Sequence, residues 1–123
     1  MVIVEKRASI LKSFGFAFNG IWLSWRERNI KIHYLAMIAV LVAAWFFGVA
    51  DFELYTILLF IAVIIALEMI NTAMEILADI VSPEYNEQIG ELKDISAGAV
   101  LWASVIAVCV ALKIFIPKIL LLL

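Results

Sequence analysis

Five polar side chains recur along one apolar stretch, residues 54–81, at spacings of one to four residues. They are Glu68, Asn71, Thr72, Glu75 and Asp79. On a helix, residues three, four and seven apart share one face, so most of this set forms a single polar stripe. A charged group at hydrocarbon depth costs roughly 2.5 kcal/mol or more, so several on one face indicate chemistry or transport.

The stripe could hold one carboxylate near a lipid headgroup and another nearer the water, since Glu68 and Glu75 lie about 10 Å apart along a helix. Glu68 is then placed as a general base. Glu75 lies where a soluble cosubstrate carrying Mg²⁺ could bind, because Mg²⁺ favours a few carboxylates together with phosphate oxygens. Lys93, in the polar segment that follows, suits phosphate charge.

Other interpretations of the same residues stay open at this point. Asn71 and Thr72 are common helix-packing residues in membranes, and Glu75 and Asp79 could simply face water. A nonenzymatic membrane oligomer that binds or conducts cations through Glu68, Asn71 and Glu75 would also explain acids in an apolar segment.

The composition supports an all-α integral membrane protein. Of 123 residues, 67% are hydrophobic, and the mean hydropathy is +1.13, more than a soluble domain of this size can bury. Three segments are long enough to span a bilayer, at about residues 32–50, 54–81 and 95–116. With no linker between them, residues 1–123 are expected to form one domain, and the single Cys109 provides no disulfide framework.

Basic residues predict the orientation. Six precede the first span, namely Lys6, Arg7, Lys12, Arg26, Arg28 and Lys31. The N-terminus and the 82–94 loop are therefore expected in the cytoplasm, although Lys113 and Lys118 near the other end oppose this weakly. Large apolar residues at helical spacing within residues 1–31 predict an amphipathic interfacial helix, with Trp side chains at headgroup depth.

The segment ALEMINTAMEILADIVSPEYNEQIGELKDISAGAV resembles the prokaryotic diacylglycerol kinase family, small membrane lipid kinases. Its pattern is E-x-x-N-[ST]-A-x-E, followed by E-Y and K-D, and the stretch E-R-N-x-x-I-H that begins at Glu27 also fits. The resemblance covers roughly residues 14–110. It implies a homotrimer in the bacterial inner membrane with a cytoplasmic active site, and the chain has no Walker A motif.

The resemblance also implies roles for particular residues in transferring the γ-phosphate of ATP to a lipid hydroxyl. Glu68 would be the catalytic base, and Glu27 and Glu75 would hold Mg²⁺. The nucleotide would be bound by Asn71 and Lys93 at the phosphates, and by Glu84, Tyr85, Asn86 and Asp94 at the sugar and base.

Three positions depart from the family pattern. Asn86 stands where some members have His, and Phe16 replaces a Tyr near the nucleotide base. Ser9 occupies the position of an N-terminal Arg, for which Lys6, Arg7 or Lys12 could substitute.

The resemblance leaves two acceptor lipids, undecaprenol and diacylglycerol. The Glu27 to His33 pattern favours the branch that phosphorylates undecaprenol. His33 itself is interpreted as an interface residue rather than a metal ligand, because the chain has no second His. No nucleic-acid partner is expected.

Overall fold

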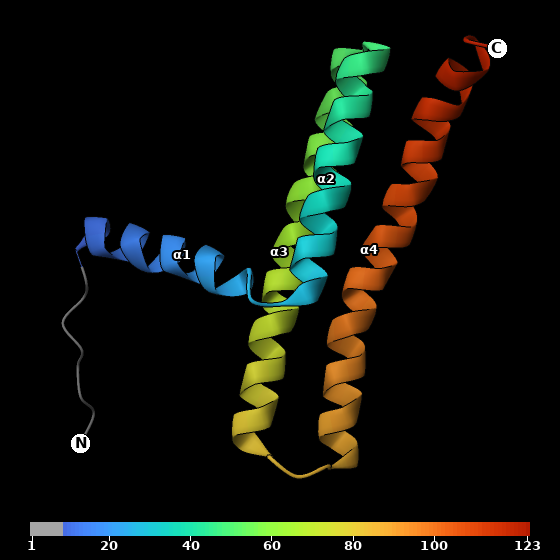
Figure 1. Cartoon of the computed structure of the whole chain (residues 1–123). Helices are drawn as coiled ribbons and strands as arrows, with labels where there is room; N and C mark the ends of the chain where they lie inside the picture. Colours follow the sequence, from blue (N-terminus) through green and yellow to red (C-terminus); the bar gives the residue numbers. More distant parts are fainter. Residues whose placement is uncertain (1–8) are drawn as a thin grey trace.

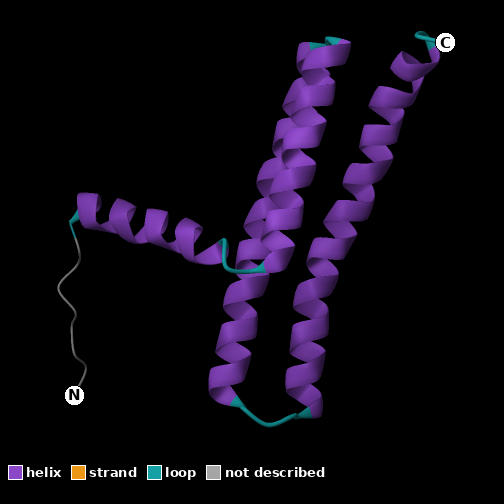
Figure 2. Cartoon of the chain, viewed as in Figure 1, coloured by secondary structure: helices purple, strands orange, loops and turns teal. Residues whose placement is uncertain are grey.

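The computed structural model describes residues 9–123, and this part of the chain is built from four helices, with no strand (Figure 2). They are α1 (Ile10–Ser24), α2 (Arg28–Phe47), α3 (Asp51–Val81) and α4 (Glu87–Leu120). The last three are long and apolar enough to cross a membrane. The predicted all-helical chain with three spanning helices is therefore confirmed, while Lys6 and Arg7 lie outside the described residues.

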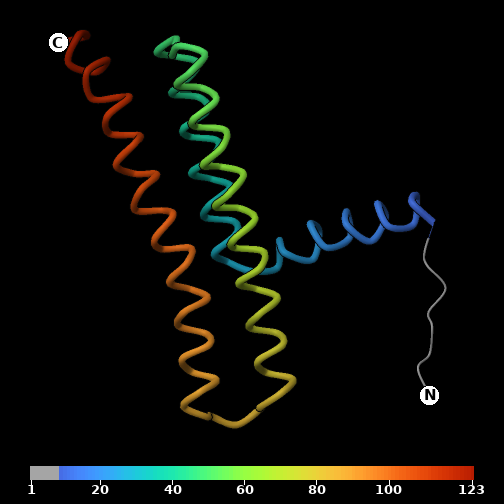
Figure 3. Tube along the Cα trace, turned by 180° about the vertical axis from the view of Figure 1, so that it is seen from behind, coloured from blue at the N-terminus to red at the C-terminus, as the bar shows by residue number. Residues whose placement is uncertain are grey.

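The helices α2, α3 and α4 form a narrow bundle from which α1 projects sideways (Figure 1). α3 lies at the centre of the contacts, since it packs against both α4 and α2 and touches α1. α1 meets α2 partway along α3, and α3 and α4 continue past this level to the loop that joins them (Figure 3). The α2–α3 turn and the C-terminus lie at the opposite end (Figure 1).

Local chemistry explains where the helices begin and end. The Ser9 hydroxyl accepts a hydrogen bond from the Lys12 amide at the start of α1, as an N-cap. α2 ends at Gly48, whose φ of 59° is the left-handed conformation that glycine adopts without a Cβ penalty. Asn86 caps α4 by accepting from the amides of Gln88 and Ile89.

This last cap corrects one predicted boundary. The segment 82–94 was expected to be a loop, but only residues 82–86 lie between the helices, and Lys93 and Asp94 are helical. The first two turns of α4 are polar, so hydrophobicity alone gave no sign of them. With 31 and 34 residues, α3 and α4 are about 46 and 51 Å long, more than the roughly 30 Å of hydrocarbon in a bilayer.

Few side chains are buried within the described chain. One small cluster joins Ala44, Ile57 and Ile114 at the end of the bundle that contains the α2–α3 turn. Trp25 stacks on Tyr34 with ring centroids 4.5 Å apart, which fixes the turn between α1 and α2. Most large apolar side chains on the spanning helices are exposed, as expected for a surface that faces lipid.

An ion pair ties α3 to α4 at the same end of the bundle. Lys118 Nζ lies 2.8 Å from Glu53 Oε2, and Glu53 also accepts a hydrogen bond from the Ala50 amide at the start of α3. Lys118 was a basic residue that opposed the predicted orientation, and its pairing with Glu53 neutralises that charge locally.

We expect this pair to stabilise the bundle without affecting turnover. Lys118→Met and Glu53→Gln should each lower the apparent Tm in detergent by a few degrees, because each leaves the other group without its partner. The double variant should lose less than the sum of the single losses. Additive losses, measured by thermal unfolding of all four proteins, would show that the pair is not energetically coupled.

Candidate active site

The polar stripe lies on the face of α3 that packs against the other helices. Glu68 is only 3% exposed and Asn71 only 4%, whereas Glu75 is half-buried and Asp79 is exposed. Burial therefore falls along α3 toward the loop. Thr72 donates to the Glu68 backbone carbonyl at 3.1 Å, so its hydroxyl is used within α3.

Glu68 has a partner on another helix. His33 Nε2, from the beginning of α2, lies 3.5 Å from Glu68 Oε2. Two other acidic groups, Glu75 and Glu27, are near enough to interact electrostatically with the same carboxylate. The structure thus places His33 at the proposed base, where the sequence predicted only an interface position.

Asn71 and Glu75 form a second group one turn closer to the loop. Asn71 Nδ2 donates to Glu75 Oε1 at 3.5 Å, while Asn71 Oδ1 is enclosed and has no partner among the described residues. An orphaned amide oxygen beside a carboxylate is a donor set that suits a hard cation such as Mg²⁺, which prefers oxygen ligands.

Glu27, the other predicted metal ligand, is exposed in the turn that precedes α2. Within residues 9–123, no three acidic, His or Cys side chains gather closely enough to enclose a metal ion. The residues present therefore fit a Mg²⁺ ion held mainly by phosphate oxygens and water, with one or two carboxylates, rather than a closed protein cage.

A third group joins α3 to α4 near the loop. Lys93 Nζ lies 2.6 Å from Asp79 Oδ1, and Glu75 also acts on this ammonium group. Lys93, the predicted phosphate-binding residue, thus extends from α4 to the polar stripe of α3. It meets the stripe at Asp79, one helical turn beyond Glu75.

The remaining predicted nucleotide residues are spread over the loop, the start of α4 and α1. Tyr85 is 89% exposed, with its ring beside Gly90, and Glu84 and Asp94 are exposed. Asn86 uses its side-chain oxygen to cap α4. Phe16 is exposed on α1, which Figure 1 shows projecting away from the loop, so this chain by itself does not bring Phe16 to Tyr85.

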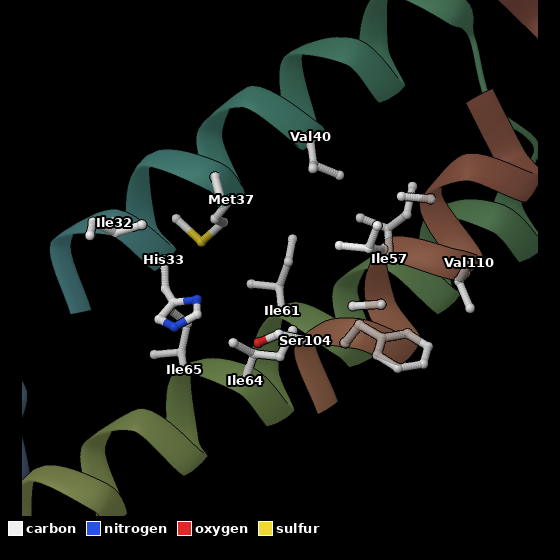
Figure 4. Close-up of a pocket in the computed structure, with 15 residues that line it drawn as sticks. Ile32, His33, Met37, Val40, Ile57, Ile61, Ile64, Ile65, Ser104 and Val110 are labelled. Carbon is white, nitrogen blue, oxygen red and sulfur yellow. The ribbon is translucent and has the colours of Figure 1, made fainter. Parts of the chain in front are cut away.

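Two cavities meet beside Glu68. One, of about 290 Å³, is the more polar of the two, since Asn29, Glu68 and Asn71 line it together with apolar side chains of α2 and α4. The other, of about 340 Å³, is lined almost wholly by apolar side chains of α2, α3 and α4 (Figure 4). Three residues, Ile32, His33 and Ser104, line both cavities. Glu68 therefore lines a partly polar cavity that adjoins an apolar one.

The sequence assigned no role in the site to four residues that the structure places at these groups. Asn29, His33 and Ser104 line the polar cavity, and Asp79 pairs with Lys93. The spacing placed Asp79 on the stripe, but it did not show the pairing with Lys93. The other three lie on different helices from the stripe, and no spacing along the chain connects them to it.

Comparison with known proteins gives the family. Residues 15–115 match the prokaryotic diacylglycerol kinase family. The chain is 37% identical to an undecaprenol kinase of Bacillus subtilis, over 87% of this chain and 88% of that protein. It is 32% identical to a diacylglycerol kinase of Synechocystis, over 91% and 65%, and 29% identical to one of Escherichia coli, over 80% and 82%.

The match extends from α1 through nearly all of α4, so it includes each group of the candidate site. The relatives are lipid kinases by name, which confirms the predicted class of enzyme and does not favour the cation-conducting alternative. The chain belongs to the prokaryotic diacylglycerol kinase family.

Proposed function

We propose that this lipid kinase transfers the γ-phosphate of ATP to the primary hydroxyl of undecaprenol, with diacylglycerol as a second acceptor. The observation that carries the proposal is the position of Glu68 where a polar cavity meets an apolar one. An amphiphile with a long apolar body and a terminal hydroxyl fits such a path, with its chain in the apolar cavity and its hydroxyl at the carboxylate.

One observation favours undecaprenol as the main acceptor. The undecaprenol kinase is more similar to this chain than the diacylglycerol kinases reported above, and it matches over nearly the full length of both proteins. The apolar lining of the larger cavity suits the hydrocarbon body of either lipid.

In the proposed reaction, Glu68 accepts the proton of the lipid hydroxyl as its oxygen attacks the γ-phosphorus and the bond to the ADP oxygen breaks. His33 holds the carboxylate in orientation from across the helix interface. Phosphoryl transfer depends mainly on positioning and charge stabilisation, so a few well-placed side chains are sufficient.

Asn71 and Glu75, with Glu27, would hold Mg²⁺ on the nucleotide phosphates. The bound ion would supply neutralisation of phosphate charge during transfer. Lys93, fixed by Asp79, would add a positive charge beside the same phosphates. The sugar and base would lie toward Asp94, Glu84, Tyr85 and Asn86 at the loop end, with Phe16 contributed from α1.

The proposed membrane position follows from the level of α1. We place α1 in the cytoplasmic interface, with its large exposed apolar side chains in the bilayer surface. Glu68 then lies near that interface, and the ends of α3 and α4 that carry Lys93 extend into the cytoplasm (Figure 1). The homotrimer implied by the family pattern would cover part of the exposed apolar surface of the bundle.

The test is transfer of labelled γ-phosphate from Mg-ATP by the reconstituted protein, with undecaprenol and diacylglycerol offered in parallel. We expect product with both lipids and more with undecaprenol. Glu68→Gln should lower turnover about 10²- to 10⁴-fold, because it keeps the size of the side chain and removes the base.

The matched control is Glu53→Gln, the same substitution near the start of the same helix, which should retain turnover. Absence of product with both lipids from a folded protein would refute the proposed acceptors. Normal turnover by Glu68→Gln would refute the base.

Glu75→Gln should weaken the use of Mg-ATP more than the use of lipid. The amide keeps one oxygen but loses the charge that favours a divalent cation. We expect a higher Mg²⁺ concentration for half-maximal rate, measured by titrating Mg²⁺ at fixed ATP. An unchanged Mg²⁺ dependence would exclude a ligand role for Glu75.

His33→Phe should lower kcat about tenfold with little change in KM for ATP, because the ring is replaced without a polar contact to Glu68. His33→Gln, which can still donate a hydrogen bond, should recover part of the rate. Steady-state kinetics of both variants distinguish a hydrogen bond to Glu68 from a packing role of His33. If His33 only packs, Phe would be tolerated better than Gln.

A further inference from the structure

Two cations at the start of α2 have no acidic partner in the part of the chain that the structure describes. Arg28 is the first residue of α2, and Lys31 follows it by about one helical turn. Both side chains are exposed, and neither forms an ion pair within residues 9–123. They lie where α1 joins α2, the level at which we place the membrane interface (Figure 1). A guanidinium and an ammonium group at this level are available to an anion.

The same face of α2 is apolar farther along the helix. Leu35, Ile38 and Val42 follow Lys31 at spacings of four, three and four residues, so they continue one stripe that begins at Arg28. All three are exposed. We call these five residues the α2 stripe. It is about 21 Å long, more than the roughly 15 Å of hydrocarbon in one leaflet of a bilayer.

The opposite face of α2 packs against the bundle, which fixes the direction of the α2 stripe. Ile30 and Ala44 are buried on that opposite face, and His33 extends from it to Glu68. The α2 stripe therefore points away from the carboxylate and toward lipid. Its two cations do not belong to the candidate active site.

We propose that the α2 stripe binds an anionic phospholipid of the surrounding bilayer, with the lipid phosphate at Arg28 and Lys31 and an acyl chain along the apolar residues. Charge complementarity selects this occupant. A zwitterionic lipid carries its own cation beside the phosphate, whereas an anionic lipid presents a charge that the two side chains neutralise. Each Lys or Arg near an anionic membrane surface contributes about fivefold in affinity.

The bound lipid holds the start of α2 at a fixed depth, and with it His33 beside Glu68. The inference rests on the proposed position of α1 in the interface. It does not depend on the reaction that the site catalyses.

The experiment measures lipid binding by native mass spectrometry of the full chain in a neutral detergent. Phosphatidylglycerol and phosphatidylcholine with identical acyl chains are titrated in parallel, and the apparent Kd of the first bound lipid is compared. We expect wild type to prefer phosphatidylglycerol by about 10- to 25-fold. In the double variant Arg28→Gln/Lys31→Gln, this preference should fall to about twofold or less, because both charges are removed.

Two controls separate the α2 stripe from net charge. Arg28→Lys/Lys31→Arg keeps both cations in place and should keep the wild-type preference to within about twofold. Arg26→Gln removes an exposed cation from the turn before α2, outside the stripe, and should also keep the preference. A loss with Arg26→Gln as large as that of the double variant would show that only the charge of the turn matters, and it would overturn the stripe.

Equal binding of the two lipids by wild type, or an unchanged preference in the double glutamine variant, would overturn the site. Glycerophosphoglycerol, the headgroup without acyl chains, should not displace the lipid at equal concentration. Displacement would show a site for phosphate alone and overturn the role of the apolar residues.

The same spectra report the mass of any oligomer. If the double glutamine variant changes that mass and leaves lipid binding as in wild type, the face is covered by a second copy of the chain and the lipid assignment is wrong. The assay contains no ATP, so failure of the proposed kinase reaction would leave each of these outcomes unchanged.

Discussion

The enclosed carboxylate of Glu68 is the constraint on which the site depends. A charge in apolar surroundings is costly unless polar groups face it, and within α3 alone only the same helical face could provide them. His33 meets this need from α2, which requires the beginning of α2 to lie beside the middle of α3. The stacked Trp25 and Tyr34 fix the turn that sets this position. The sideways direction of α1 is therefore linked to the chemistry through α2.

The remaining groups follow from Glu68 in order along one axis. On one side lies the apolar cavity; on the other come Asn71 with Glu75, then Asp79 with Lys93, and then the loop. Because a helix rises by about 1.5 Å per residue, the spacing of these residues in the sequence determines how far apart they lie along the helix axis. In the proposed reaction, the lipid, the transferred phosphate and the nucleotide would occupy successive levels along α3 and α4.

The same rise explains which parts of the site could be predicted from the sequence. Glu68, Asn71 and Glu75 share a helix, so their spacing alone placed them on one face, and the structure shows this arrangement. His33 and Ser104 reach the site through packing between helices, which no local periodicity encodes. The start of α4 was missed for another reason: Asn86 creates it by capping amides in a polar segment, where a hydrophobicity pattern carries no signal.

The lengths of the helices bear on how far the site extends along the bundle. α2 has 20 residues, enough to cross the hydrocarbon, whereas α3 has 31, an excess of about 16 Å of helix. Most of this excess lies beyond the level of α1, where the Lys93–Asp79 pair joins α3 to α4 (Figure 1). In the proposed mechanism, this helix pair would hold Lys93 at a fixed distance from Glu68, and phosphoryl transfer depends mainly on such positioning. The extension of α3 and α4 beyond α1 therefore fixes how far Lys93 lies from Glu68 along the bundle.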